Sequence, residues 1–306
     1  MNEAESGGRW DGVKRHWFLY LMLLPAVVYF IVLRFYPMFL QMVLAFKDYQ
    51  LMRGVWDSPW VGLDNFRHIF GQADFGRVLR NTVEISLLRL GFGFLPPLLL
   101  AIFLYDLSKG WLRKVSQTIL YIPHFFSWVV IYGIVFALFS NSGFVSLLIE
   151  KIFGSDIDFL MGSEWFRPLL IGSGIWKEIG WSTIIYLAAL TAIDQTLYEA
   201  AKIDGAGPWK RTWHITLPGM RSIVIFLLTL SLGNILYAGG EQILLFYSPA
   251  TYEVGDVIDT WIYRQGISQL QYSLATAASL FQSLFGFLLV IGANYVSKRY
   301  AQTGIW

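Results

Sequence analysis

The sequence predicts an all-α membrane protein with six transmembrane helices. Hydrophobic residues make up 56% of the 306 residues and charged residues only 14%, whereas a soluble domain contains roughly a quarter charged residues. Backbone groups in lipid must be hydrogen-bonded within their own segment, so apolar stretches of about 20 residues are expected to cross as helices. Six stretches reach that length: Trp17–Pro37, Thr82–Tyr105, Thr118–Phe139, Leu169–Leu190, Ser222–Phe246 and Leu274–Ser297.

The first stretch is predicted to stay in the membrane as a helix. A polar run up to His16 precedes it, but the apolar part is long and lacks a small-residue cleavage site, so it does not match a secretory signal. Prolines inside three of the spans are expected to kink their helices, with neighbouring helices supporting the freed backbone groups. These prolines are Pro25, Pro96, Pro97 and Pro123.

The distribution of Lys and Arg predicts that both termini are cytoplasmic. Segments on the side of the N-terminus carry more Lys and Arg than the longer segments on the other side, as the positive-inside rule requires. The predicted organisation is a cytoplasmic segment 1–16, a membrane domain 17–300 with a cytoplasmic loop 191–221, and a cytoplasmic tail 301–306. The outer loops are rich in aromatic residues, which fits either an interfacial belt or a docking surface for an extracytoplasmic protein.

Composition and motifs exclude several function classes. The net charge is only +2 and no basic run occurs, so nucleic acid is not expected as a partner. The four histidines are scattered and there is no cysteine, so no metal site is predicted. Neither a phosphate-binding Gly-x4-Gly-Lys-Ser/Thr loop nor a Gly-x-Ser-x-Gly elbow is present. The chain is therefore not expected to be an enzyme or to bind a cofactor, and any ATP must be hydrolysed by another subunit.

The polar loop between the fourth and fifth spans contains a spaced motif. Glu199-Ala200-Ala201 predicts a helical turn with a small face, and Gly205 and Gly207-Pro208 are expected to end it. Small side chains let a second backbone approach closely, and a carboxylate can pair with a basic group. The motif residues are Glu199, Ala200, Ala201, Asp204, Gly205, Ile215, Leu217 and Pro218.

These residues resemble the EAA loop of permease subunits in binding-protein-dependent ABC importers. The stretches 121–128, 175–181 and 252–260 are also similar to the Lpl-type polysaccharide and oligosaccharide branch of the sugar permeases. The resemblance covers nearly the whole chain. It implies a type I ABC importer permease fold, in which the loop forms a helix that sits in a cleft of the ATPase.

The same resemblance implies an assembly in the bacterial cytoplasmic membrane. Its expected parts are a second homologous permease subunit, two ATPase subunits that bind ATP and Mg, and an extracytoplasmic solute-binding protein. The expected substrate is an oligosaccharide. Two alternatives remain open at this point: an ABC permease for a non-sugar solute, and a secondary transporter that works alone. The second alternative predicts inverted repeats, which the sequence does not show.

Polar side chains inside the spans are candidates for a substrate pathway, because ionisable groups in a membrane are costly and usually functional. With a rise of about 1.5 Å per residue, Arg89, Glu178, Asn234 and Gln282 reach a common depth of roughly 12–14 Å. A carboxylate beside an aromatic ring suits a sugar, whose C–H face covers the ring. The alternative is that Arg89 neutralises a glutamate and the glutamines only bridge helices. The candidates are Arg89, Trp176, Glu178, Trp181, Asn234, Tyr237, Glu241, Gln242 and Gln282.

Overall fold

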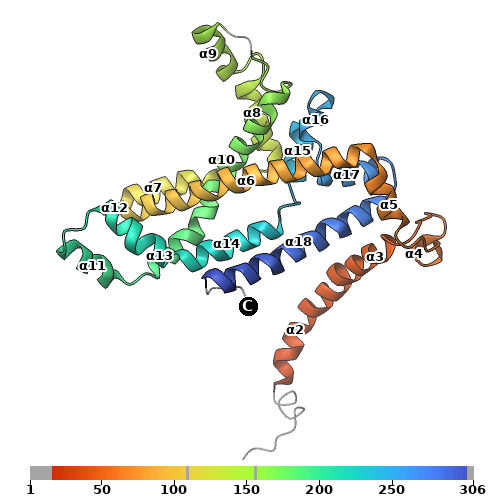
Figure 1. The fold of residues 1–306 in the computed structure, drawn as a ribbon, viewed down its shortest axis with the longest axis horizontal. Helices are drawn as coiled ribbons and strands as arrows, with labels where there is room; N and C mark the ends of the chain where they lie inside the picture. The colour runs from red at the N-terminus through yellow and green to blue at the C-terminus, as the bar shows by residue number, and fades with distance from the viewer. Residues whose placement is uncertain (1–15, 108–109, 155–156, 302–306) are drawn as a thin grey trace, which may run out of the picture.

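The computed structural model describes residues 16–107, 110–154 and 157–301, and this part of the chain is helical (Figure 1). Within it there is one isolated bridge, between Lys47 and Trp60, and no strand. The all-α prediction is confirmed. The predicted cytoplasmic segment 1–16 and tail 301–306 lie outside the described residues, except for residues 16 and 301.

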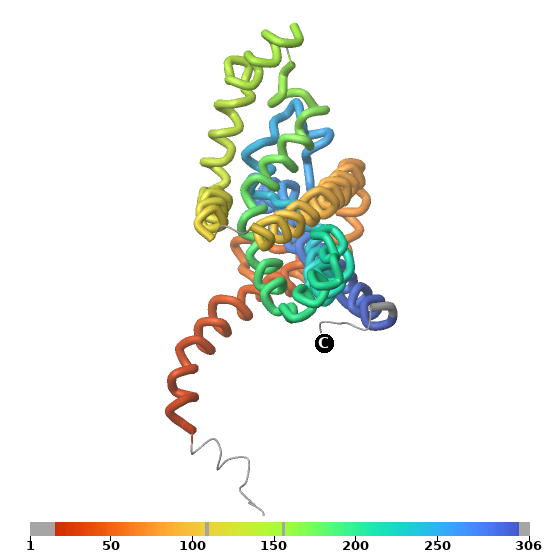
Figure 2. Tube along the Cα trace, turned by 90° about the vertical axis from the view of Figure 1, so that its left-hand side faces the viewer, coloured from red at the N-terminus to blue at the C-terminus, as the bar shows by residue number. Residues whose placement is uncertain are grey.

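The N-terminal helix stands apart from the rest of the molecule over its first part and packs against α18 (Tyr272–Ala301) over its last part. It comprises α2 (Trp17–Phe30), the π-helical η1 (Ile31–Phe35) and α3 (Tyr36–Leu44), and none of their residues is buried. Figures 1 and 2 show α2 pointing away from the other helices. The helix continues beyond the predicted end at Pro37, because proline is tolerated in the first turn of α3 and apolar residues follow it.

The centre of the molecule is built from long helices. The helix α6 (Ala73–Asp106) packs along α10 (Ser163–Thr191), and α14 (Arg221–Gly233) crosses α18 (Tyr272–Ala301). At the second crossing, a Cβ atom on Gly286 would lie 2.4 Å from the carbonyl oxygen of Gly233. Glycine is therefore required for this close approach, as in many membrane helix pairs.

The third predicted span, Thr118–Phe139, is not one helix. The structure has α7 (Gly110–Tyr121), a 3₁₀ turn η2 (Ile122–Phe125), extended backbone at Phe126, and then α8 (Trp128–Phe139). Proline at 123 removes a backbone donor. The ammonium group of Lys177 stabilises the break by donating to the carbonyl oxygens of His124 and Phe126, at 2.6 and 2.7 Å.

The fifth predicted span, Ser222–Phe246, is also wrong as a continuous helix. The helix α14 ends at Gly233, and α15 (Gly240–Phe246) starts after a non-helical stretch that contains Gly239 at φ 84°. A Cβ atom on Gly239 would lie 2.2 Å from Nη1 of Arg89, so this glycine allows the arginine to approach the backbone. Helical spacing predicts that Asn234, Tyr237 and Glu241 share one face of a continuous helix, and the break shows that this prediction is wrong.

Among the described residues, four helices are long and apolar enough to cross a membrane. They are Trp17–Leu44, Ala73–Asp106, Trp128–Phe153, in which α8 and α9 (Phe144–Phe153) are counted together, and Tyr272–Arg299. A fifth candidate joins Pro208–Gly219 to Arg221–Gly233 across a bend of 60°. The helix α10 contains the predicted span Leu169–Leu190 but is not among these candidates. Several apolar helices are thus present, while six spans remain a prediction.

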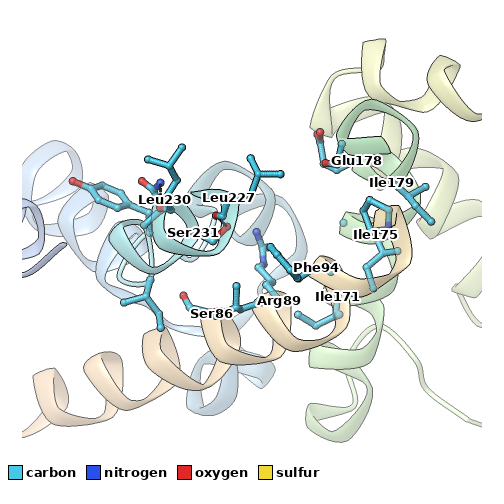
Figure 3. A pocket seen from close by; sticks show the side chains of 18 of the residues that line it. Ser86, Arg89, Phe94, Ile171, Ile175, Glu178, Ile179, Leu227, Leu230 and Ser231 are labelled. Carbon is cyan, nitrogen blue, oxygen red and sulfur yellow. Dashed lines mark hydrogen bonds between the residues drawn. The ribbon is translucent and has the colours of Figure 1, made fainter. Parts of the chain in front are cut away.

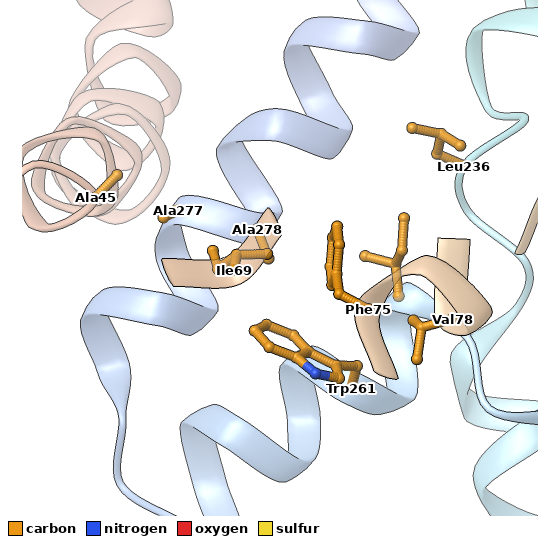
Figure 4. Close-up of a cluster of buried hydrophobic side chains, with 9 residues drawn as sticks. Ala45, Ile69, Phe75, Val78, Leu236, Trp261, Ala277 and Ala278 are labelled. Carbon is orange, nitrogen blue, oxygen red and sulfur yellow. The ribbon is translucent and has the colours of Figure 1, made fainter. Parts of the chain in front are cut away.

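Two of the shorter helices, α5 (Asp64–Gly71) and α17 (Ile258–Tyr263), contribute Ile69, Ile258 and Trp261 to an apolar core (Figure 4). In this core the ring of Phe75 on α6 meets the buried Trp261 edge to face, with ring centroids 5.4 Å apart. Such a pair contributes about 0.5–1.5 kcal/mol beyond area burial. The short elements are α4 (Gly54–Asp57), α5 (Asp64–Gly71), α9 (Phe144–Phe153), η4 (Pro249–Thr251), α16 (Tyr252–Gly255), α17 (Ile258–Tyr263) and η5 (Arg264–Ser268).

Candidate functional site

A central cavity of about 450 Å³ lies between α6, α10 and α14 (Figure 3). Leucine, isoleucine and aromatic side chains form much of its wall, including Phe94 and Trp128. A few polar groups interrupt this apolar lining, as is usual for small-molecule sites. The polar residues are Ser86, Arg89, Glu178, Ser182, Ser231, Asn234 and Tyr237.

Arg89 extends from α6 into the space between α6 and α14 (Figure 3). Its Nη2 donates to Oε1 of the buried Gln242 at 2.5 Å. Gln242 is held in turn by donation from its Nε2 to the carbonyl of Leu170 and the hydroxyl of Ser173. Within the described part of the chain, the Nε of Arg89 has no hydrogen-bond partner. The guanidinium is thus oriented while retaining unused donor capacity.

Glu178 lies on the opposite wall and already has cationic and aromatic neighbours. Its Oε2 is 2.9 Å from Nδ1 of His124, and its Oε1 is 3.8 Å from the ammonium of Lys177. The His124 ring stacks on Trp181 with centroids 4.4 Å apart and an interplanar angle of 1°. This group joins α10 to the break between α7 and α8, so the wall of the cavity depends on that break.

The nine predicted pathway residues are only partly brought together. Four of them line the cavity: Arg89, Glu178, Asn234 and Tyr237. Gln242 and Gln282 are buried and bridge helices, and Gln282 donates to Asp259 and to the carbonyl of Leu236. Trp176, Trp181 and Glu241 are exposed and do not line it.

The sequence alone did not single out Ser86 and Ser231, which line the cavity, or His124, which pairs with Glu178. Pro123 was the available signal for His124, since a break at that proline turns the following residue out of the helix. The contact between His124 and Glu178 spans 54 positions, and no local pattern reports such a distance. The alternative in which a glutamate neutralises Arg89 also differs from the structure, where Gln242 holds the guanidinium.

The motif loop folds into α11 (Gln195–Ile203), α12 (Pro208–Arg211), the π-helical η3 (Thr212–Thr216) and α13 (Leu217–Gly219), which gather at one end of the molecule (Figure 1). Asp194 caps α11 by accepting the Thr196 amide at 2.9 Å, and this hydrogen bond lowers the pKa of Asp194. The cap is therefore complete above the usual carboxyl pKa and is lost as the pH falls through the lowered value.

The C-terminus of α11 is a complete Schellman motif. The amide of Ala206 donates to the carbonyl of Ala201 at 2.8 Å, and that of Gly205 donates to the carbonyl of Lys202 at 3.1 Å. Gly205 has φ 76°, which glycine adopts without steric cost. The expectation that a helical turn ends at Gly205 is confirmed.

The motif side chains largely face outward. Glu199, Ala200, Asp204 and Pro218 are exposed, while Ala201, Ile215 and Leu217 are half-buried. The buried Tyr198 anchors α11 to η3 through its hydroxyl, which lies 2.9 Å from that of Thr216. The side chain of Ile203 is 88% exposed, which is unusual for an isoleucine and indicates an uncovered contact surface.

Residues 97–302 match the family described as binding-protein-dependent transport system inner membrane component, and the chain belongs to this family. It is similar to protein LplB of Bacillus subtilis (44% identity, covering 99% of this chain and 96% of LplB). It is also similar to YteP of the same organism, a polygalacturonan/rhamnogalacturonan transport system permease protein (43% identity, covering 94% and 90%).

The fold matches a solved bacterial alginate ABC transporter in complex with an alginate pentasaccharide-bound periplasmic protein. The TM-score is 0.88 at 41% identity, covering 97% of this chain and 99% of the other. The fold is therefore that of an ABC importer permease. The chain is a multi-pass protein of the cytoplasmic membrane and a subunit of a binding-protein-dependent importer, which removes the stand-alone secondary transporter from consideration.

Proposed function

We propose that this permease moves oligosaccharides that carry carboxylate groups, and that the central cavity is the place where they cross. The relatives support this substrate class. YteP is named for polygalacturonan and rhamnogalacturonan, and the matched structure for alginate. All three polymers contain uronic acids, so their fragments combine sugar hydroxyls with carboxylates.

The observation that carries the proposal is the position of Arg89. A guanidinium has five N–H donors and binds a carboxylate through two of them. Gln242 occupies only part of this capacity, and Asp259, whose charge acts on Arg89, already accepts hydrogen bonds from Gln282 and the Gly240 amide. Ser231 and Asn234 add polar atoms for hydroxyls, while Phe94 and Trp128 offer apolar surface. The set suits an acidic sugar better than a purely apolar or cationic solute.

Uptake by the reconstituted importer tests the substrate class. An oligogalacturonide and its carboxyl-reduced counterpart differ only at C6, where a hydroxymethyl group replaces the carboxylate, so the ratio of their uptake rates isolates the carboxylate. We expect Arg89→Gln to reduce uptake of the acidic sugar by about tenfold or more, since a hydrogen bond between charged groups is worth about 1.5–3 kcal/mol, and to spare the neutral one. Arg80→Gln is the control, because Arg80 lies exposed on the same helix and pairs with Glu84. An equal loss for both sugars would refute the role of the charge.

The energy for transport is proposed to enter through the α11–α13 segment. An ATPase subunit would contact the motif residues of this segment, which are Glu199, Ala200, Ala201, Asp204, Gly205, Ile215, Leu217 and Pro218. Two such subunits would bind ATP and Mg, and this chain would bind neither. The exposed Ile203 and the outward-facing small residues support a protein partner at this surface. Charge reversal at Glu199 should uncouple ATP hydrolysis from uptake, and intact coupling would contradict the assignment.

The uncovered N-terminal helix supports a second permease subunit as partner. Although α3 packs against α18, no residue of α2 or α3 is buried, so most of this apolar surface must contact lipid or another protein. The topology proposed with it has six spans and both termini in the cytoplasm, with segment 1–16, membrane domain 17–300, coupling loop 191–221 and tail 301–306. Labelling of single cysteines from either side of the membrane tests this topology directly, since the chain has no native cysteine.

A further inference from the structure

A second cavity, of about 560 Å³, opens beside the α11–α13 segment. It lies where the end of α6 meets α7, α11 and α12. Three cationic side chains line it, Arg113, Lys202 and Arg211, against one carboxylate, Asp106. We call this cavity the basic cleft. The excess of positive charge favours an anionic ligand.

The arginines of the basic cleft are incompletely satisfied within the described part of the chain. Arg113 is held by donation from its Nη2 to the carbonyl oxygens of Tyr105 and Leu107, at 2.8 and 2.9 Å. Its Nε is buried without a hydrogen-bond partner, and the same is true of Nε of Arg211. An unpaired buried donor on a charged group is costly. Two such groups around one cavity indicate a missing acceptor.

Exposed tryptophans place the basic cleft at the level of lipid headgroups. Trp111 precedes Arg113 by two positions in α7, and Trp209 precedes Arg211 by two positions in α12. Both are more than half exposed, and Trp209 stacks on the equally uncovered Trp213 with ring centroids 6.5 Å apart. Tryptophan prefers the membrane interface, where its ring meets acyl chains and its N–H meets water. A basic pocket at this depth on the cytoplasmic side has the properties of a phospholipid site.

We propose that the basic cleft binds the phosphate group of an anionic phospholipid. Arg113 and Arg211 supply charge-assisted donors, and Lys202 adds a third cation at the rim. Because α6, α7, α11 and α12 all contribute, a bound headgroup connects the α11–α13 segment with the ends of two membrane helices. The lipid thereby stabilises the position of α11, the helix to which the proposed function assigns ATPase contact.

Native mass spectrometry of the assembled importer, released from nanodiscs of defined composition, tests binding without relying on transport. We expect phosphatidylglycerol to be retained and phosphatidylcholine to be lost. Arg113→Gln combined with Arg211→Gln should weaken retention at least tenfold. The matched control is Lys114→Gln with Lys210→Gln, which removes the same charge from exposed neighbours that do not line the cleft. Equal retention in the two double variants would overturn the proposal.

Three further measurements distinguish a lipid headgroup from other ligands of the basic cleft. If the arginine variant does not assemble, the wild-type complex still answers, because equal retention of the two lipids would overturn the site. Inorganic phosphate added to phosphatidylcholine nanodiscs distinguishes a soluble anion from a lipid headgroup. If phosphate raised the ATPase activity of the importer as much as phosphatidylglycerol does, the assignment of the cleft to a lipid would be refuted. If the arginine variant lost ATPase activity even in nanodiscs of pure phosphatidylcholine, the basic cleft would instead be assigned to a carboxylate of the partner protein, and the lipid site would be overturned. Failure of uptake with lipid retention intact would count against the proposed function only.

Discussion

Replacing Gly205 by alanine should loosen the end of α11 through backbone conformation alone. An added Cβ meets nothing within 4 Å, so there is no steric clash with neighbours. The cost arises because Gly205 has φ 76°, and a left-handed conformation costs a non-glycine residue about 1–2 kcal/mol. This corresponds to a factor of about 5–30 in the equilibrium between the closed and the open turn.

Amide hydrogen exchange of Ala206 measures this opening, because its N–H closes the motif on Ala201. We expect exchange to accelerate by about 5–30-fold in Gly205→Ala, and by less in Gly205→Asn, since asparagine tolerates positive φ better. Gly207→Ala is the matched control: it has φ −67° and equally open space. If the control accelerates exchange as much, or asparagine is no better than alanine, the conformational argument is refuted.

Two further substitutions test the packing around the cavity. Gly180→Ala should lower the melting temperature, since its Cβ would lie 2.0 Å from the carbonyl oxygen of Leu120. Overpacking of this kind costs about 1–3 kcal/mol. The control is Gly172→Ala on the same helix, which has open space around it and should leave the melting temperature unchanged. Lys177→Met should destabilise the break between α7 and α8, because the carbonyls of His124 and Phe126 lose their donor. Each carbonyl left without a hydrogen bond costs about 1–3 kcal/mol of stability. Unchanged thermal unfolding would show that water replaces the ammonium group.

Local features of this fold were predictable from the sequence, and long-range ones were not. The turn at Gly205 follows from glycine after a short helix, and the apolar helices follow from runs of hydrophobic residues. The break before α15 was not predicted, because most of residues 235–246 are apolar, although the Gly239-Gly240 pair was a local signal for it. It depends on Arg89, 150 positions away, occupying the space that a side chain at Gly239 would fill.

The same distinction applies to the cavity. Helical spacing puts Glu178, Trp181 and Ser182 on one face of α10. Glu178 and Ser182 line the cavity, whereas Trp181 stacks on His124 and does not. Gln282 matched the other candidates by depth and Gln242 was a candidate as a polar residue in a span, but both are buried as helix bridges, because their hydrogen-bond partners come from other segments. Polar residues in a span are therefore good candidates for a site, while only the three-dimensional neighbours decide between lining and bridging.

The helix α14 lies between two places where the backbone gives up helical geometry. Its start is bent by 60° against the preceding α12–α13 stretch, and its end passes into the non-helical residues 234–239. With thirteen residues it is about 20 Å long and much stiffer than either joint. A displacement of the α11–α13 segment would therefore be transmitted as a rigid-body rotation of α14. Ser231 and Asn234, at the far end of α14, would then move relative to the other walls of the cavity.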